Sequence, residues 1–135
     1  MRSKLAAVLL VVGGVLMLLS AFAHAFQGWP AMAAGLAPHP VDPEIHAALA
    51  IGWIWGSACM AGLGVLTLGC LPGVRRGERS ARFATATAGF TWLLFGLGAL
   101  YWRWPKTHFL AFVVLGAIVL AGLLLQPRAA APSSR

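Results

Sequence analysis

The sequence predicts an all-α fold, a polytopic membrane bundle of four helices with both termini in the cytoplasm. Three observations lead to this prediction. Of the 135 residues, 60% are hydrophobic and 10% are charged, a balance outside the range of soluble globular domains. Four apolar runs have about the length, roughly 17 to 25 residues, that a helix needs to cross a hydrocarbon core. All ten lysines and arginines stand between or beyond those runs, where membrane topology places them.

The four helices are expected at about residues 5–26, 43–70, 81–103 and 107–126. Together they make a single transmembrane domain over residues 1–127. The last residues, 128–135, spell RAAAPSSR and carry no apolar pattern. They are therefore expected to form a disordered cytoplasmic tail.

The first apolar run, Leu5 to Ala23, has two interpretations. Ala23-His24-Ala25 has the small-x-small form of a signal-peptide cleavage site, and cleavage of residues 1–25 would leave three helices. The run is 19 residues long, however, and signal peptides contain only ~7 to 15 apolar residues. One helical face also collects small and polar residues: Gly13, Met17, Ser20 and His24. A retained helix would turn such a face toward its neighbours, so the sequence favours retention.

The stretch from residue 27 to residue 43 is expected to be an outer loop, because four prolines interrupt it: Pro30, Pro38, Pro40 and Pro43. Residues 29–37 have the composition of a short helix lying in the membrane interface. At the end of the loop, Asp42 is a good N-cap and Pro43 suits the first helical position. The second long helix is therefore expected to begin at Asp42 or Pro43.

The second helix contains GWIWG, a pair of glycines one turn apart at Gly52 and Gly56. In lipid, small residues at this spacing let two helices approach closely. The pair predicts a packing seam, either within the chain or with a second copy or another membrane protein. The third helix has a polar face, formed by Thr87, Thr91, Leu94, Gly98 and Tyr101. Its threonines either return their hydroxyl bonds to their own helix or line a small ligand cavity.

Orientation follows from the ten lysines and arginines. Eight lie at the N-terminus, in the loop around residues 71–82 and in the tail: Arg2, Lys4, Arg75, Arg76, Arg79, Arg82, Arg128 and Arg135. Only Arg103 and Lys106 lie elsewhere. Because cytoplasmic loops carry the excess of basic residues, we expect both termini inside. The net charge of +7 therefore reflects topology and contact with the lipid bilayer rather than nucleic-acid binding. Small size and the preference for arginine point to the inner membrane of a bacterium.

No Asp, Glu, Lys or Arg lies inside an apolar run, which argues against ion pumps and proton-coupled carriers. The chain also lacks nucleophile, paired-cysteine and glycine-loop motifs of enzymes. These absences favour a non-enzymatic accessory or interaction subunit.

The alternative function is binding of a metal, a haem or a small ligand at the outer face. Three histidines, His24, His46 and His108, fall at the outer ends of three different helices. Side chains of neighbouring helices can converge on one ion or on the two faces of a haem. Trp53 follows His46 by seven residues on the same helical face and is expected to wall such a pocket.

Overall fold

The computed structural model describes residues 2–127, and helices make up all regular structure in that range. In chain order they are α1 (Arg2–Ala23), η1 (His24–Gly28), α2 (Trp29–Leu36), α3 (Pro43–Gly69), α4 (Leu71–Arg76), α5 (Arg79–Arg103), η2 (Thr107–Phe109) and α6 (Leu110–Leu125). The predicted tail, 128–135, lies outside the described residues. Four helical stretches are long and apolar enough to cross a membrane: Ser3–Leu36, Pro43–Arg76, Arg79–Arg103 and Thr107–Leu125. The all-helical class and the four candidate spans are thus confirmed.

The first span is longer than the sequence predicted. α1, η1 and α2 follow one another without a break over the 34 residues Ser3–Leu36, and the connection to α3 shrinks to residues 37–42. Pro30 does not interrupt the span because it lies in the first turn of α2, directly after the π-helical turn η1. Proline lacks an N–H and crowds the carbonyl four residues before it, and a π-helical turn accommodates that misfit. The short helix at residue 29 therefore extends the first span.

The start of α3 was predicted correctly. Its first residue is Pro43, and Asp42 is the N-cap. A side-chain oxygen of Asp42 accepts a hydrogen bond from the backbone N–H of Glu44 at 2.8 Å. This bond satisfies one of the amide groups left free at a helix start.

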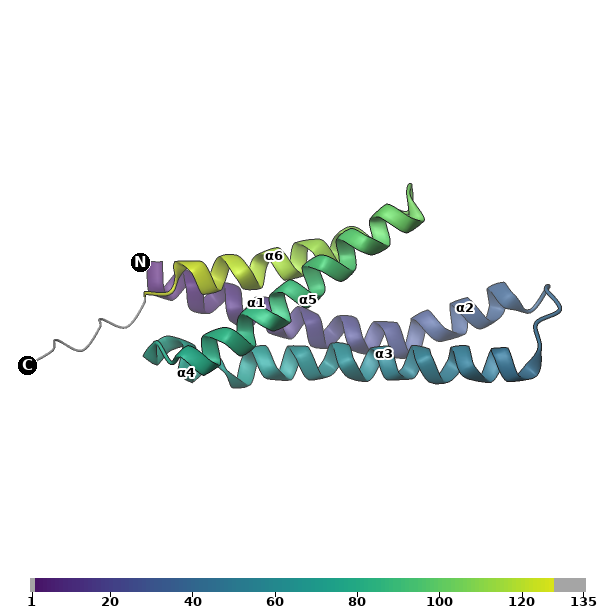
Figure 1. Cartoon of the computed structure of the whole chain (residues 1–135), viewed down its shortest axis with the longest axis horizontal. Coiled ribbons are helices and arrows are strands. Elements are labelled where there is room, and N and C mark those ends of the chain that lie inside the picture. Colours follow the sequence, from purple (N-terminus) through teal and green to yellow (C-terminus); the bar gives the residue numbers. More distant parts are fainter. Residues whose placement is uncertain (1, 128–135) are drawn as a thin grey trace, which may run out of the picture.

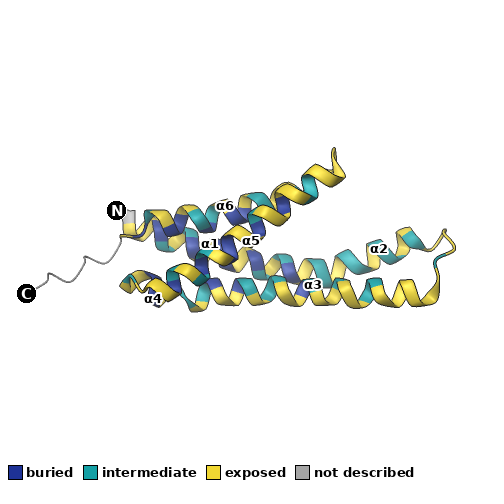
Figure 2. Ribbon diagram, viewed as in Figure 1, coloured by how far each residue is buried: buried dark blue, intermediate teal, exposed yellow. Residues whose placement is uncertain are grey.

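The helices form two antiparallel hairpins, as Figure 1 shows. α1 runs beside α3, α5 runs beside α6, and α1 also packs against α6. The α5–α6 hairpin diverges from α1 and α3 toward the η2 turn. Buried residues gather where α1, α5 and α6 cross and near α4 (Figure 2). The largest members of this core include Leu10, Met17, Trp92, Leu115 and Val119.

Two faces identified in the sequence can be compared with this core: the stripe on the first helix and the polar face of the third. Gly13 and Met17 are buried, while Ser20 and His24 are partly buried, so the stripe on the first helix does face the other helices. On the polar face of α5 the threonines return their hydroxyl bonds to their own helix, which is the first of the two alternatives, and Thr87 is exposed. Its hydroxyl donates to the Phe83 carbonyl at 3.0 Å, and that of Thr91 donates to the Thr87 carbonyl at 2.9 Å.

Close helix contacts occur at glycines other than the predicted pair. A Cβ added to Gly64 of α3 would lie 3.0 Å from the Gly14 carbonyl oxygen of α1. A Cβ on Gly116 of α6 would lie 2.5 Å from the Leu93 nitrogen of α5. A Cβ on Gly52 meets nothing within 4 Å, and one on Gly56 meets only the His24 ring, at 3.9 Å. GWIWG therefore forms no helix seam within this chain.

Candidate functional site

The structure separates the three histidines of the hypothetical metal or haem site. His24 begins η1 and faces α3, whereas His46 lies in the first part of α3 beside Trp29, with ring centroids 5.3 Å apart. His108 lies in η2, packed on Phe109 at 4.1 Å, on the hairpin that diverges from α1 and α3 (Figure 1). Among the described residues no three His, Cys, Asp or Glu side chains lie close enough to hold a metal ion.

Instead, the structure brings His24 together with Trp53. Their rings stack with centroids 4.2 Å apart and planes 7° apart. The Trp53 indole N–H donates to the backbone carbonyl of His24 at 2.7 Å. The His24 Nδ1 lies 2.9 Å from the Ser57 Oγ. One hydrogen bond and a stacking contact therefore hold the His24 ring, and a second hydrogen bond joins the His24 backbone to Trp53.

The Ser57 hydroxyl is shared between two neighbours. It has one hydrogen, and its oxygen lies 3.0 Å from the Trp53 carbonyl and 2.9 Å from His24 Nδ1. When the hydrogen is donated to the Trp53 carbonyl, the Ser57 oxygen accepts from His24 and Nδ1 of the neutral imidazole carries the ring proton. In this tautomer the other ring nitrogen, Nε2, keeps its lone pair and is free to accept a hydrogen bond.

A glycine makes the stacked arrangement possible. A Cβ added to Gly28, in η1, would lie 2.8 Å from the six-membered ring of Trp53. The absence of that carbon lets the indole lie directly against the first span. Trp29 continues the aromatic packing, because its ring lies 6.4 Å from Trp53 and 5.3 Å from His46. Two tryptophans, Trp53 and Trp29, thus lie in a chain of ring contacts between His24 and His46.

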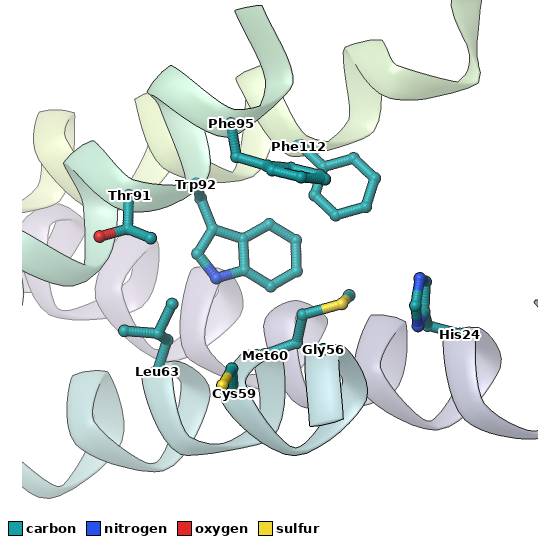
Figure 3. Close-up of a pocket in the computed structure, with 9 residues that line it drawn as sticks. All are labelled: His24, Gly56, Cys59, Met60, Leu63, Thr91, Trp92, Phe95 and Phe112. Carbon is teal, nitrogen blue, oxygen red and sulfur yellow. The ribbon is translucent and has the colours of Figure 1, made fainter. Parts of the chain in front are cut away.

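A pocket of about 270 Å³ opens beside His24, between α3 and the α5–α6 hairpin. Figure 3 shows its residues: His24, Gly56, Cys59, Met60, Leu63, Thr91, Trp92, Phe95 and Phe112. Trp92 stacks on Phe112 with centroids 5.1 Å apart, and Phe95 meets the same phenylalanine edge-on at 5.0 Å. The pocket is therefore almost entirely apolar, with aromatic rings along one wall and His24 at one end (Figure 3).

Trp92 lines the pocket and carries a buried nitrogen. Its side chain is 3% exposed, and its indole Nε1 has no hydrogen-bond partner among the described residues. In Figure 3 this nitrogen lies on the edge of the ring that faces α3. A buried N–H without a partner is uncommon in folded proteins, and such groups are expected to find an acceptor.

Sequence reasoning found His24 and Trp53 but missed the wall from α5 and α6. A signal for it exists in the sequence. Small residues recur at helical spacing on one face of α5, at Ala81, Thr85, Ala88, Gly89 and Gly96, and all are buried. Trp92 is the one large residue on that face. A single large side chain in a row of small ones indicates that the neighbouring helix lies farther from α5 at that position, so that a pocket can form there.

Comparison with protein-family models, curated proteins and solved structures found no match for this chain. Its function is therefore inferred from the pocket itself.

Proposed function

We propose that this chain is a non-enzymatic, multi-pass protein of a bacterial inner membrane that binds a small lipid-soluble ligand in the pocket beside His24. The ligand class is a ring with oxygen substituents, such as a quinone or a phenol. The observation that carries the proposal is the buried Trp92 indole N–H. It lacks a partner among the described residues and belongs to a side chain that lines an almost entirely apolar pocket.

The unpaired donor has an energetic consequence. A buried polar group without a hydrogen bond costs about 1–3 kcal/mol. A ligand oxygen that accepts from the Trp92 N–H would recover this free energy on binding. A pure hydrocarbon of the same shape would recover none of it, so the pocket should discriminate between the two by roughly 5-fold to 150-fold.

His24 offers a complementary group at the end of the pocket. Its Nε2 lone pair accepts a hydrogen bond, whereas Trp92 donates one. A phenolic hydroxyl has a hydrogen for the first and an oxygen for the second, and a quinone carbonyl suits Trp92. Both ligand types present a flat ring, which matches the wall formed by Trp92, Phe95 and Phe112.

Size and access also suit a single ring. A cavity of about 150 Å³ already admits benzene, and this pocket has about 270 Å³. Three of its lining residues, Cys59, Thr91 and Phe95, are exposed on the outside of the helices. In a membrane that surface would meet lipid, so a ligand dissolved in the bilayer could enter from the side.

The test compares a short-tailed benzoquinone with an alkylbenzene of the same tail. Binding to the detergent-purified protein is measured by the rise in unfolding temperature as each compound is added. The wild type is expected to bind the quinone at least fivefold more tightly. The Trp92→Phe variant keeps an aromatic ring without the N–H and is expected to bind both compounds equally.

A second pair of variants locates the site. Gly56 lies in the pocket wall, and a Cβ there would contact only His24. Gly56→Leu should therefore fill the pocket and abolish binding. Gly62→Leu is the control, because Gly62 lies on the same helix and its Cβ would meet nothing within 4 Å. Quinone binding that survives Gly56→Leu, or equal wild-type affinity for the two compounds, would contradict the proposal.

A second candidate function is that of an interaction subunit, acting through a second copy of this chain. The supporting observation is the open face of α3 around Gly52, flanked by Ile51, which is 71% exposed, and Trp55, which is 70% exposed. Gly52→Leu would then convert an oligomer in detergent to monomer, as measured by light scattering. A wild-type protein that is already monomeric in detergent and in nanodiscs would contradict this candidate.

A further inference from the structure

A separate cleft lies among residues of α1, of α4 and of the segment after α6. Figure 1 shows that these three parts of the chain lie at the same end of the bundle, the end marked N. The cleft has a volume of about 540 Å³, and the residues that line it include Ser3, Lys4, Val8, Arg75 and Gln126. They come from the first turns of α1, the end of α4 and the residue after α6. We refer to these five residues as the basic cleft.

We propose that the basic cleft binds the phosphate group of an anionic membrane lipid. This proposal does not depend on the ring ligand, because no residue is shared between the basic cleft and the pocket beside His24.

Gln126 provides the first part of the case. Its side chain is 5% exposed, and its Nε2 has no hydrogen-bond partner among the described residues. An amide NH₂ donates two hydrogen bonds, and a buried donor without an acceptor is unfavourable. Gln126 lines the cleft, and turning its amide toward a bound phosphate would supply the missing acceptor.

The charges around the cleft favour an anion. Lys4 and Arg75 are exposed on its walls, and the free backbone N–H groups at the start of α1 carry the positive end of a helix dipole. The nearby carboxylate, Glu78, is already engaged by Arg76 at 2.6 Å. The other two acidic residues of the chain are Asp42 and Glu44, at the opposite end of α3.

The apolar part of the cleft points to a lipid as the source of the phosphate. Val8, one turn beyond Lys4 on α1, is 55% exposed and belongs to the same cleft. Leu5 on the same helix is 53% exposed. Together they form an apolar surface that leads from the charged groups along a candidate membrane span. An acyl chain attached to the phosphate would cover this surface, whereas free phosphate would leave it bare.

The experiment measures binding to the full chain in detergent by native mass spectrometry. The probes are short-chain phosphatidylglycerol, phosphatidylcholine with the same chains, and inorganic phosphate. Phosphatidylglycerol is expected to bind more tightly than the other two. Arg75→Gln and Gln126→Leu should each weaken its binding about tenfold, because each removes a hydrogen-bond donor to the phosphate.

Arg79→Gln is the matched control. Arg79, the first residue of α5, is exposed and does not line the cleft, and its replacement changes the net charge equally. It should change binding less than twofold. Equal loss in Arg75→Gln and Arg79→Gln would overturn the proposal in favour of general charge attraction. Equal binding of phosphatidylcholine, or inorganic phosphate binding that depends on the same residues, would also overturn it. If Gln126→Leu fails to fold, the lipid binding measured for Arg75→Gln alone tests the proposal, because Arg75 is exposed.

Discussion

Replacing Gly116 with alanine should destabilise the α5–α6 hairpin strongly. The new Cβ would lie 2.5 Å from the backbone nitrogen of Leu93 and 2.6 Å from the carbonyl oxygen of Gly89. Both are backbone atoms of α5, so no side-chain rotation relieves the overlap and the two helices must move apart. Overpacking of this kind costs about 1–3 kcal/mol, and the separation would also loosen the contacts around Trp92 that shape the pocket.

The assay is unfolding of the detergent-solubilised protein by increasing SDS, followed by circular dichroism and tryptophan fluorescence. Gly98→Ala serves as the control because it lies on α5 and an added Cβ would meet nothing within 4 Å. Alanine is a better helix former than glycine by about 0.5–1 kcal/mol, so the control should be neutral or slightly stabilised. If both variants unfold at the wild-type SDS concentration, α5 and α6 do not pack as described.

Three further predictions concern the His24 region and the topology. Gly28→Ala should displace the Trp53 ring from the first span, because the added Cβ would lie 2.8 Å from that ring. The near-ultraviolet circular dichroism spectrum should therefore change. An unchanged spectrum would contradict the stacked geometry. Ser57→Ala removes the hydrogen-bond partner of His24 Nδ1 and should lower the free energy of unfolding by about 0.5–1.5 kcal/mol. Thr87→Ala, which removes an exposed hydroxyl bonded only to its own helix, should have a smaller effect. Equal effects of the two substitutions would contradict the role of Ser57 in holding His24. A reporter that is active only outside the cytoplasm should be silent when fused after Arg79 and active when fused near Ala37. The reason is that the loop containing Arg79 carries the excess of basic residues, which marks the cytoplasmic side. The reverse pattern of activity would contradict the predicted orientation.

Features determined by neighbouring residues in the chain were predictable from the sequence. Asp42 and Pro43 mark the start of α3 because capping is local. The Gly13 to His24 stripe faces inward as expected, since helical periodicity alone determines which residues share a face. The continuous first span was not predictable, because a proline rule does not show that a π-helical turn precedes Pro30.

Features that depend on how helices are rotated and tilted were harder to predict. The Gly52–Gly56 spacing indicates that close approach is possible, but not which face of α3 a neighbour covers. The sequence places His24 and His108 near helix ends. It does not show that the two hairpins diverge, which carries η1 and η2 apart. Trp92 was missed because its importance comes from an unpaired nitrogen, which only the packed structure reveals.

The most direct test of the central claim is the carbonyl stretching frequency of a bound benzoquinone, measured by isotope-edited infrared spectroscopy with a carbon-13-labelled carbonyl. A hydrogen bond from the Trp92 N–H weakens the C=O bond, so the wild-type complex should show a band at lower frequency than the quinone in detergent alone. In Trp92→Phe the band should return to the detergent value. The same band in the wild type and in Trp92→Phe would contradict the assignment of Trp92 as the donor that the ligand satisfies.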